Sequence, residues 1–349
     1  MNPIKNAVLF NLYLIGASLL FTLAAVKKKG RSTHTVGIGA AGTLKIVDNP
    51  AFPDHDFFQA GATFPIQIRH ASVTFPDDAA KDLRSASIRF AALDKESPLD
   101  ILMNTGPRTF RHLEEFWNFT LASVRGKQPD ELTSSTGLKA YCEKEPVFKE
   151  IFAETMRRAP VSLAQVYYYS KLVNFFRAKD GKVRYVKYRL VPEDRGVDSG
   201  VPTGLDNQQP WNQERSPEET RSPTYLRDEY RERVARKPII FHLQLRLHDE
   251  IEGDTNGRIN GDRSEIFTQE KDWSEDTSPW LDLATLSIDR MLTDGEAEKL
   301  SFNVGRQPAS LGAVTGYSAR DPNSINAARI LIYKFSKAAR GWVGTRSAT

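Results

Sequence analysis

The chain has a single cysteine, Cys142, among its 349 residues. One cysteine excludes an internal disulfide framework and any metal site built from several thiolates. An excess of charge of one sign is also lacking, because 48 basic residues stand against 44 acidic ones. The net charge is only +4, and no basic stripe interleaved with aromatic residues is found in the sequence. These features give no support for nucleic-acid binding.

Long apolar runs are scarce except near the N-terminus. Hydrophobic residues make up 40% of the chain and charged residues 26%, which is the balance of a soluble globular body. Residues 7–26 carry no charge and are long enough to cross about 30 Å of hydrocarbon. Because lysines follow this segment, we expect a membrane-associated segment at residues 1–29 and a body of residues 30–349 on the cytoplasmic side. The alternatives are a helix packed on the body and a helix lying flat in a bilayer interface.

The body reads as strands and helices of one large domain without internal repeats. Alternation of apolar and polar residues predicts strands at residues 43–47, 64–74, 85–93, 99–104, 182–192, 239–248 and 281–291. Helices are expected at residues 109–124, 137–157 and 225–236 and after the capping run that begins at Asp321. Polar stretches at 193–223 and 249–272 should be surface loops. Asp254 opens a sequence similar to a calcium loop, but its spacing to a glutamate is wrong for one.

Three glycines, Gly37, Gly39 and Gly42, satisfy the G-x-G-x-x-G fingerprint of dinucleotide-binding proteins. That fingerprint needs a hydrophobic strand before the glycines and a helix after them, so that a pyrophosphate meets a helix N-terminus. Here the polar residues 31–35 precede the glycines and the alternating residues 43–47 follow them. We therefore reject a dinucleotide-binding interpretation.

The first half of the chain carries a histidine and basic residues in a distinctive order. Arg31 stands three positions before His34, and a glycine-rich strand follows. Further along come Arg69, at the end of Phe-Pro-Ile-Gln-Ile-Arg, and Asn104, in Asp-Ile-Leu-Met-Asn-Thr-Gly. This order resembles that of haem catalases, in which the corresponding residues are the distal histidine, the distal asparagine and arginines that face haem propionates. His70 directly follows Arg69 on the strand, so its side chain should point away from such a site.

The resemblance continues near the end of the chain. Arg329-Ile-Leu-Ile-Tyr333 reproduces the Arg-x-x-x-Tyr of the catalase proximal helix, and Arg340 lies where another propionate arginine is found. The resemblance implies that Tyr333 is the axial ligand of haem iron and that Phe110 packs on the haem. A phenol loses its proton at about pH 10 in water. At neutral pH the phenolate therefore has to be stabilised by the iron and by a neighbouring guanidinium. Arg329 shares the helix face of Tyr333 and can donate a hydrogen bond to it.

The fold implied by this resemblance is α+β, a catalase-like antiparallel β-barrel of about eight strands that encloses ferric haem b. Helices flank the barrel, and the proximal helix follows the barrel at the C-terminal end of the domain. Two departures from catalases favour another branch of the family: the chain ends soon after the proximal helix, and Thr33 stands where catalases have an aliphatic residue. Both features are similar to the compact, catalase-related allene oxide synthases, which act on fatty-acid hydroperoxides. A hydroxyl beside His34 could hold the imidazole and make it a poorer proton shuttle for hydrogen peroxide.

The sequence thus predicts a haem enzyme that rearranges or cleaves hydroperoxides of polyunsaturated fatty acids, with His34, Asn104 and Thr33 as catalytic residues. Its alternative is a small catalase or peroxidase that consumes hydrogen peroxide. A haem carrier without enzymatic activity is a more distant third hypothesis. The expected partners are the hydroperoxide and a membrane, and a homo-oligomer stays open.

Overall fold

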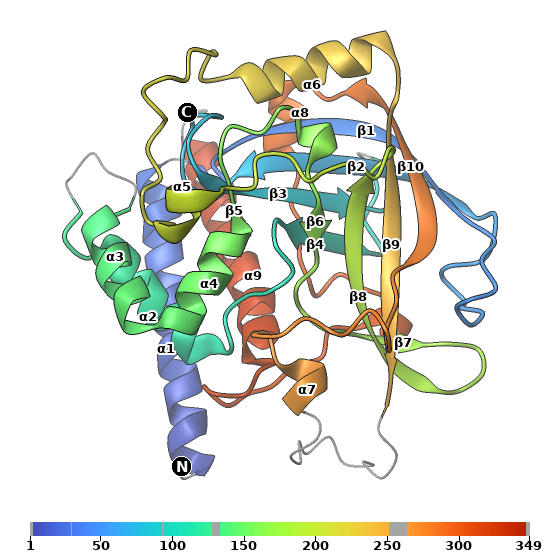
Figure 1. Ribbon diagram of the computed structural model, residues 1–349. Helices are drawn as coiled ribbons and strands as arrows, with labels where there is room; N and C mark the ends of the chain where they lie inside the picture. Colours follow the sequence, from blue (N-terminus) through green and yellow to red (C-terminus); the bar gives the residue numbers. More distant parts are fainter. Residues whose placement is uncertain (1–2, 29, 93, 128–132, 251–263, 347–349) are drawn as a thin grey trace.

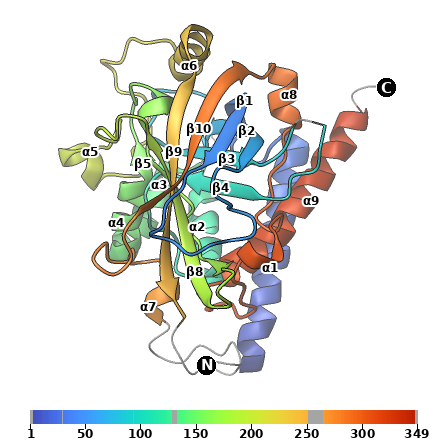
Figure 2. The same cartoon turned by 90° about the vertical axis from the view of Figure 1, so that its right-hand side faces the viewer.

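The computed structural model describes residues 3–28, 30–92, 94–127, 133–250 and 264–346. Eight antiparallel strands close into a barrel, because β2 pairs with β1 on one side and with β3 on the other. Figures 1 and 2 show this barrel with most helices gathered on one side of it. Around the barrel the strands are β1 (Val36–Ile46), β2 (Thr63–Ser72), β3 (Asp82–Arg89), β4 (Asp100–Asn104), β6 (Tyr168–Tyr169), β8 (Val183–Pro192), β9 (Ile239–Asp249) and β10 (Leu281–Met291). The predicted antiparallel α+β barrel is confirmed.

Two further strands and the helices complete the described part of the chain. The short strand β5 (Met156–Arg157) pairs with β3, and β7 (Asn174–Arg177) pairs with β8. The α-helices are α1 (Pro3–Lys27), α2 (Leu113–Val124), α3 (Ser135–Lys144), α4 (Pro146–Thr155), α5 (Gly204–Gln208), α6 (Tyr225–Arg236), α7 (Ser264–Phe267), α8 (Asp294–Lys299) and α9 (Ser324–Arg346).

Side chains fill the interior of the barrel. Alternate residues of each strand, such as Ile66 and Ile68 of β2, point inward and are buried. His70 belongs to this inward set and lies among the rings of Tyr168, Tyr230 and Phe241. The prediction that His70 points away from Arg69 is therefore consistent with the structure, and space for a cofactor has to lie outside the barrel wall.

The glycines of β1 serve close packing. The strand runs straight through all three of them, which excludes the dinucleotide-binding arrangement. A Cβ atom on Gly37 would lie 2.8 Å from the guanidinium carbon of Arg69, and one on Gly42 would overlap the carbonyl oxygen of Ser287. The pairing of β1 with β10 also shifts register at Ala41/Gly42.

Several predicted boundaries need correction. The single helix expected at residues 137–157 is wrong: α3 ends at Lys144, and Pro146 starts α4 at its first position. Proline has no backbone N–H and its ring clashes with the preceding turn, so one continuous helix cannot pass through it. The helix expected from residue 109 begins at Leu113, because His112 caps it. The expected loop 249–272 contains α7, and Asp254 lies outside the described residues.

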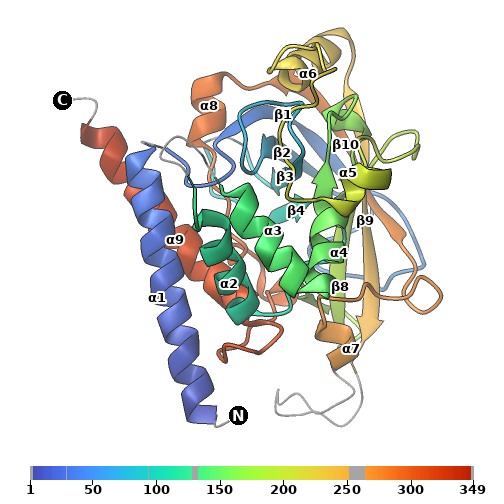
Figure 3. The same ribbon diagram turned by 60° about the vertical axis from the view of Figure 1, so that its left-hand side comes forward.

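The apolar N-terminal segment forms α1, which packs by one face against α9 and α2 (Figure 3). Phe10 and Ala17 are buried there, and Gly16 lies against the ring of Trp117. By length and composition α1 could cross a membrane, although helices in the cores of soluble proteins and signal sequences have the same character. The structure thus has the helix packed on the body, and membrane association stays a prediction.

Candidate functional site

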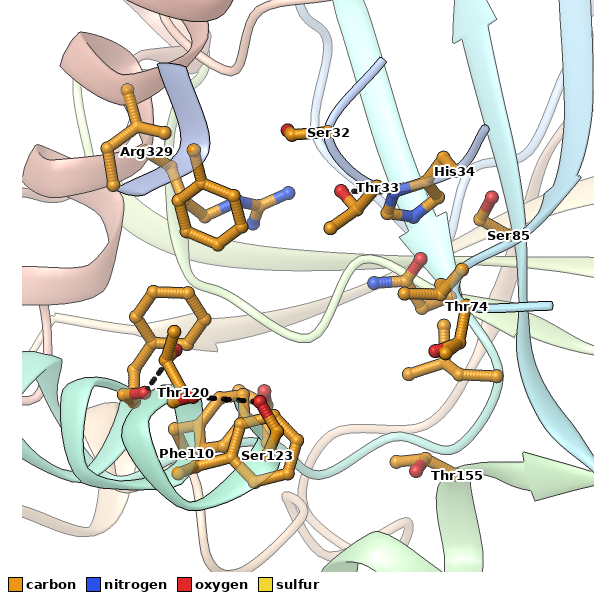
Figure 4. A pocket seen from close by; sticks show the side chains of 18 of the residues that line it. Ser32, Thr33, His34, Thr74, Ser85, Phe110, Thr120, Ser123, Thr155 and Arg329 are labelled. Carbon is orange, nitrogen blue, oxygen red and sulfur yellow. Dashed lines mark hydrogen bonds between the residues drawn. The ribbon is translucent and has the colours of Figure 1, made fainter. Parts of the chain in front are cut away.

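A cavity of about 490 Å³ lies between the barrel wall and the helices α1, α2, α4 and α9. Its barrel side is formed by outward-facing residues of β2, β3 and β4. Most of the wall is apolar, and a few polar groups reach it from opposite sides. Figure 4 shows Thr33 and His34 on one side of the open space and Arg329 across from them. Residues far apart in the sequence, from positions 31 to 333, therefore meet at this cavity.

His34 lies in the segment just before β1, with its backbone in the left-handed region at φ 56°. Its N–H donates to the carbonyl oxygen of Val73 over 3.0 Å, which fixes this unusual turn against the end of β2. Burial lowers the pKa of the imidazole to about 3, and the positive charges of Arg69 and Arg31 contribute to the shift. The ring is therefore neutral at physiological pH and has a nitrogen that can accept a proton.

Two polar neighbours orient the His34 ring. The hydroxyl of Thr33 lies 3.1 Å from Nδ1 and forms a hydrogen bond with it. Asn104, the last residue of β4, also hydrogen-bonds the imidazole and partly opposes the fall of its pKa. Both side chains line the cavity. The structure thus brings together the three residues that the sequence suggested for catalysis.

Arg31 and Arg69 line the same side of the cavity. Arg69 donates from Nη1 to the carbonyl oxygen of His34 over 3.1 Å. Arg31 donates from Nη2 to the carbonyl oxygen of Leu300 over 2.6 Å, and its Nε lies 3.4 Å from a carboxylate oxygen of Glu298. The two guanidinium groups hold the segment around His34 and supply positive charge that suits carboxylates.

Arg329 and Tyr333 share one face of α9 and line the cavity. The phenol oxygen of Tyr333 lies 3.2 Å from Nε and 3.1 Å from Nη2 of Arg329. A phenolate in this position would accept both hydrogen bonds. The third arginine expected at the site, Arg340, also lies on α9, but its side chain is outside the described residues.

Phe110 forms part of an aromatic wall. Its ring centroid lies 5.1 Å from that of Phe119 and 5.4 Å from that of Phe148. The hydroxyls of Thr120 and Ser123 also reach this wall, but each donates to a carbonyl oxygen of its own helix, as Figure 4 shows. This part of the cavity therefore presents an apolar surface to whatever occupies it.

Sequence reasoning missed one buried cation at the cavity. Lys171 lines it and has a backbone φ of 59°. Burial lowers the pKa of its ammonium to about 7, Glu154 opposes this shift, and Arg157 adds to it. No sequence pattern around Lys171 predicts its burial, because the residue follows a strand of only two residues.

Comparisons with known proteins agree with this geometry. No family model matches the chain. The chain is 41% identical over 319 residues to the allene oxide synthase-lipoxygenase protein of Plexaura homomalla, which covers 90% of the chain and 28% of that protein. It is 25% identical over 336 residues to the linolenate 9R-lipoxygenase of a Nostoc species, covering 92% of the chain and 40% of that protein. The chain thus spans less than half the length of these curated relatives.

Among solved structures, a fungal catalase superposes with a TM-score of 0.69 at 18% identity. The superposition covers 92% of this chain and 62% of the catalase chain. The chain therefore has the catalase fold, and its resemblance to the catalase-related, allene oxide synthase branch is confirmed.

Proposed function

We propose that the protein binds ferric haem b in this cavity and acts on hydroperoxides, which it rearranges or cleaves. The preferred substrates are hydroperoxides of polyunsaturated fatty acids. The observation that carries the proposal is the placement of His34 and Asn104 at one side of the cavity and of the Arg329–Tyr333 pair at another. The similarity to an allene oxide synthase-lipoxygenase protein supports the same activity.

The residues at the cavity fit a haem. Tyr333 would provide an oxygen ligand, and Arg329 would keep that ligand anionic through its two hydrogen bonds. Arg31 and Arg69, both at the edge near His34, would pair with propionates, and Arg340 is proposed for the same task. The apolar wall with Phe110 would pack on the macrocycle. A bound haem would supply the iron chemistry that cleaves the O–O bond of a hydroperoxide.

The chain's own residues would bind the substrate and move its proton. The neutral His34 ring would accept the hydroperoxide proton because of its position at the cavity, since its lowered pKa makes it a weak base, and the Asn104 amide would donate to an oxygen of the substrate. The hydroxyl of Thr33 would hold the imidazole in one orientation. The apolar lining that a haem leaves uncovered would exclude water and accommodate an acyl chain.

A second candidate function is the decomposition of hydrogen peroxide by a small catalase or peroxidase. The superposition on a fungal catalase supports it, and His34 with Asn104 could serve either substrate. The hydrogen bond between Thr33 and His34 favours the lipid substrate, because an imidazole held by a hydroxyl is a poorer shuttle for both protons of hydrogen peroxide.

The test is side-by-side turnover by protein purified with haem supplied. We expect an absorption spectrum of a phenolate-ligated ferric haem and rapid conversion of a fatty-acid hydroperoxide, with slow oxygen release from hydrogen peroxide. A colourless, haem-free preparation would contradict the haem enzyme. Rapid oxygen release without lipid conversion would replace the preferred function by the second candidate.

A further inference from the structure

Helix α1 presents an apolar stripe on the face that points away from the body. The stripe consists of Val8, Leu12, Ile15, Leu19 and Leu23, whose exposed fractions lie between 52% and 64%. Their spacing of three or four residues places them along one side of the helix, over about 22 Å. Apolar surface of this length on a helix marks an interaction site more often than chance exposure does.

The opposite face of α1 is attached to the body along most of its length. Near the start, the carbonyl oxygen of Asn6 accepts a hydrogen bond from Ala319 over 3.2 Å. In the middle, the ring of Tyr13 stacks on Trp117, and further on Phe21 stacks on Phe116. Figure 3 shows α1 and α9 side by side. These contacts hold α1 against the body and leave the stripe exposed to a partner.

This attachment argues against a membrane-spanning position of α1. The hydroxyl of Tyr13 lies 3.4 Å from the carboxylate of Glu114, which also pairs with Arg320. If α1 crossed a bilayer while packed on the body, this ion pair would enter hydrocarbon, where charges are costly. If α1 crossed alone, all contacts of its inner face would be lost.

The ends and polar groups of α1 suit a bilayer surface that carries negative charge. Lys27 is the last residue of the helix and Lys28 follows it. Burial lowers the pKa of the Lys28 ammonium most, and the nearby charge of Lys127 lowers it further. Asn11, beside the stripe, donates its amide to the carbonyl oxygen of Ala7 over 2.9 Å, so this donor is satisfied within the helix. Apolar helix faces bordered by lysines bind anionic interfaces.

The helix that carries the stripe also borders the cavity with its inner face. Leu20, Phe21 and Ala24 of α1 line the cavity, together with Lys28 and Lys127. We propose that the α1 stripe docks the protein on an anionic lipid bilayer, with the helix lying along the surface and not across it. The cavity then lies directly behind α1, on the side away from the lipid, so the path of an amphipathic substrate from the bilayer surface to the cavity is short. This last step rests on the proposed function, whereas the docking does not.

Co-sedimentation with vesicles tests the docking. The 349-residue chain is mixed with phosphatidylcholine vesicles that contain or lack phosphatidylserine. The variant Leu12→Glu/Leu19→Glu changes only exposed residues, and Leu205→Glu on α5, 67% exposed, is the matched control. We expect binding that phosphatidylserine strengthens, that falls roughly a hundredfold in the double variant and that is unchanged in the control.

Three results would overturn the docking proposal. The first is no sedimentation with either vesicle, and the second is retention of the protein on membranes after a carbonate wash, which would indicate a spanning helix. The third is a wild-type dimer that the double variant dissociates without change in vesicle binding, which would assign the stripe to a second copy. Missing haem or missing turnover would contradict only the proposed function. With that function intact, the double variant should lose turnover of vesicle-embedded hydroperoxide and keep turnover of a dispersed one.

Discussion

Replacing Thr33 by valine removes one hydroxyl from the cavity and keeps the shape of the side chain. In the structure this hydroxyl lies 3.1 Å from Nδ1 of His34 and is one of two side-chain groups that hydrogen-bond the ring. The second hydrogen bond, with Asn104, is kept in the variant. The variant therefore changes the orientation of the imidazole without changing the residues that would contact a haem.

The size of the effect follows from the hydrogen bond that is lost. A neutral hydrogen bond contributes about 1 kcal/mol, which corresponds to roughly a fivefold change in an equilibrium at 25 °C. If the bond keeps His34 in an orientation that disfavours the second proton transfer from hydrogen peroxide, Thr33→Val should raise oxygen release about fivefold. Conversion of a fatty-acid hydroperoxide, which needs one proton acceptor, should change less.

Oxygen evolution and lipid turnover are measured on the same haem-loaded preparation, normalised to haem content. Thr33→Ser is the control, because it retains the hydroxyl and should behave like the wild type. Equal oxygen release from the valine variant, the serine variant and the wild type would refute the role of Thr33. Support for a lipid substrate would then rest on the similarity to the allene oxide synthase-lipoxygenase protein and on the apolar lining of the cavity.

Three further predictions address the ligand, the pH dependence and the core. Tyr333→Phe should abolish the phenolate charge-transfer bands of the haem-loaded protein, and an unchanged spectrum would remove Tyr333 as ligand. Burial lowers the pKa of His70 from 6.5 to about 3, so on acidification the unfolded chain binds the proton first and the free energy of unfolding falls between these pH values. His70→Leu should reduce that slope by up to about 1.4 kcal/mol per pH unit in urea denaturation, and an identical slope would contradict the assignment. Ile68→Ala, at a fully buried barrel position, should lower the free energy of unfolding by about 2–5 kcal/mol, whereas Leu205→Ala should change it by less than about 0.5 kcal/mol.

Secondary structure was predicted well from the sequence wherever apolar residues recur with the period of a strand or a helix, because that recurrence follows the buried face of the element. The alternation in β8, β9 and β10 and the charged helix α6 matched the structure closely, because one face of each is packed against the barrel core. The proline at position 146 was visible and should have divided the predicted helix. In contrast, the boundaries of β3 depend on pairing with β2, which is a long-range interaction that no local pattern records.

The candidate site was predictable only through its resemblance to a family. The pattern Arg329-x-x-x-Tyr333 has a local reason, since both residues share a helix face. The position of His34 has no such local cause, because its positive φ and its hydrogen bond with Val73 are set by the packing of two strands. No sequence pattern predicted the burial of Lys171, because its burial follows from the position of β6 in the barrel wall.

The packing of α1 against α9 has a consequence for biosynthesis. The cavity takes one wall from α1, which precedes every strand of the barrel in the chain, and another from α9, which follows every strand. During translation the inner face of α1 can reach α2 early, but its docking site stays incomplete until α9 has emerged, and the apolar part that packs on α9 is exposed in that interval. Apolar surface that is exposed during synthesis favours aggregation. Cofactor loading can be completed only after synthesis of α9, because the proposed ligand Tyr333 lies on that helix.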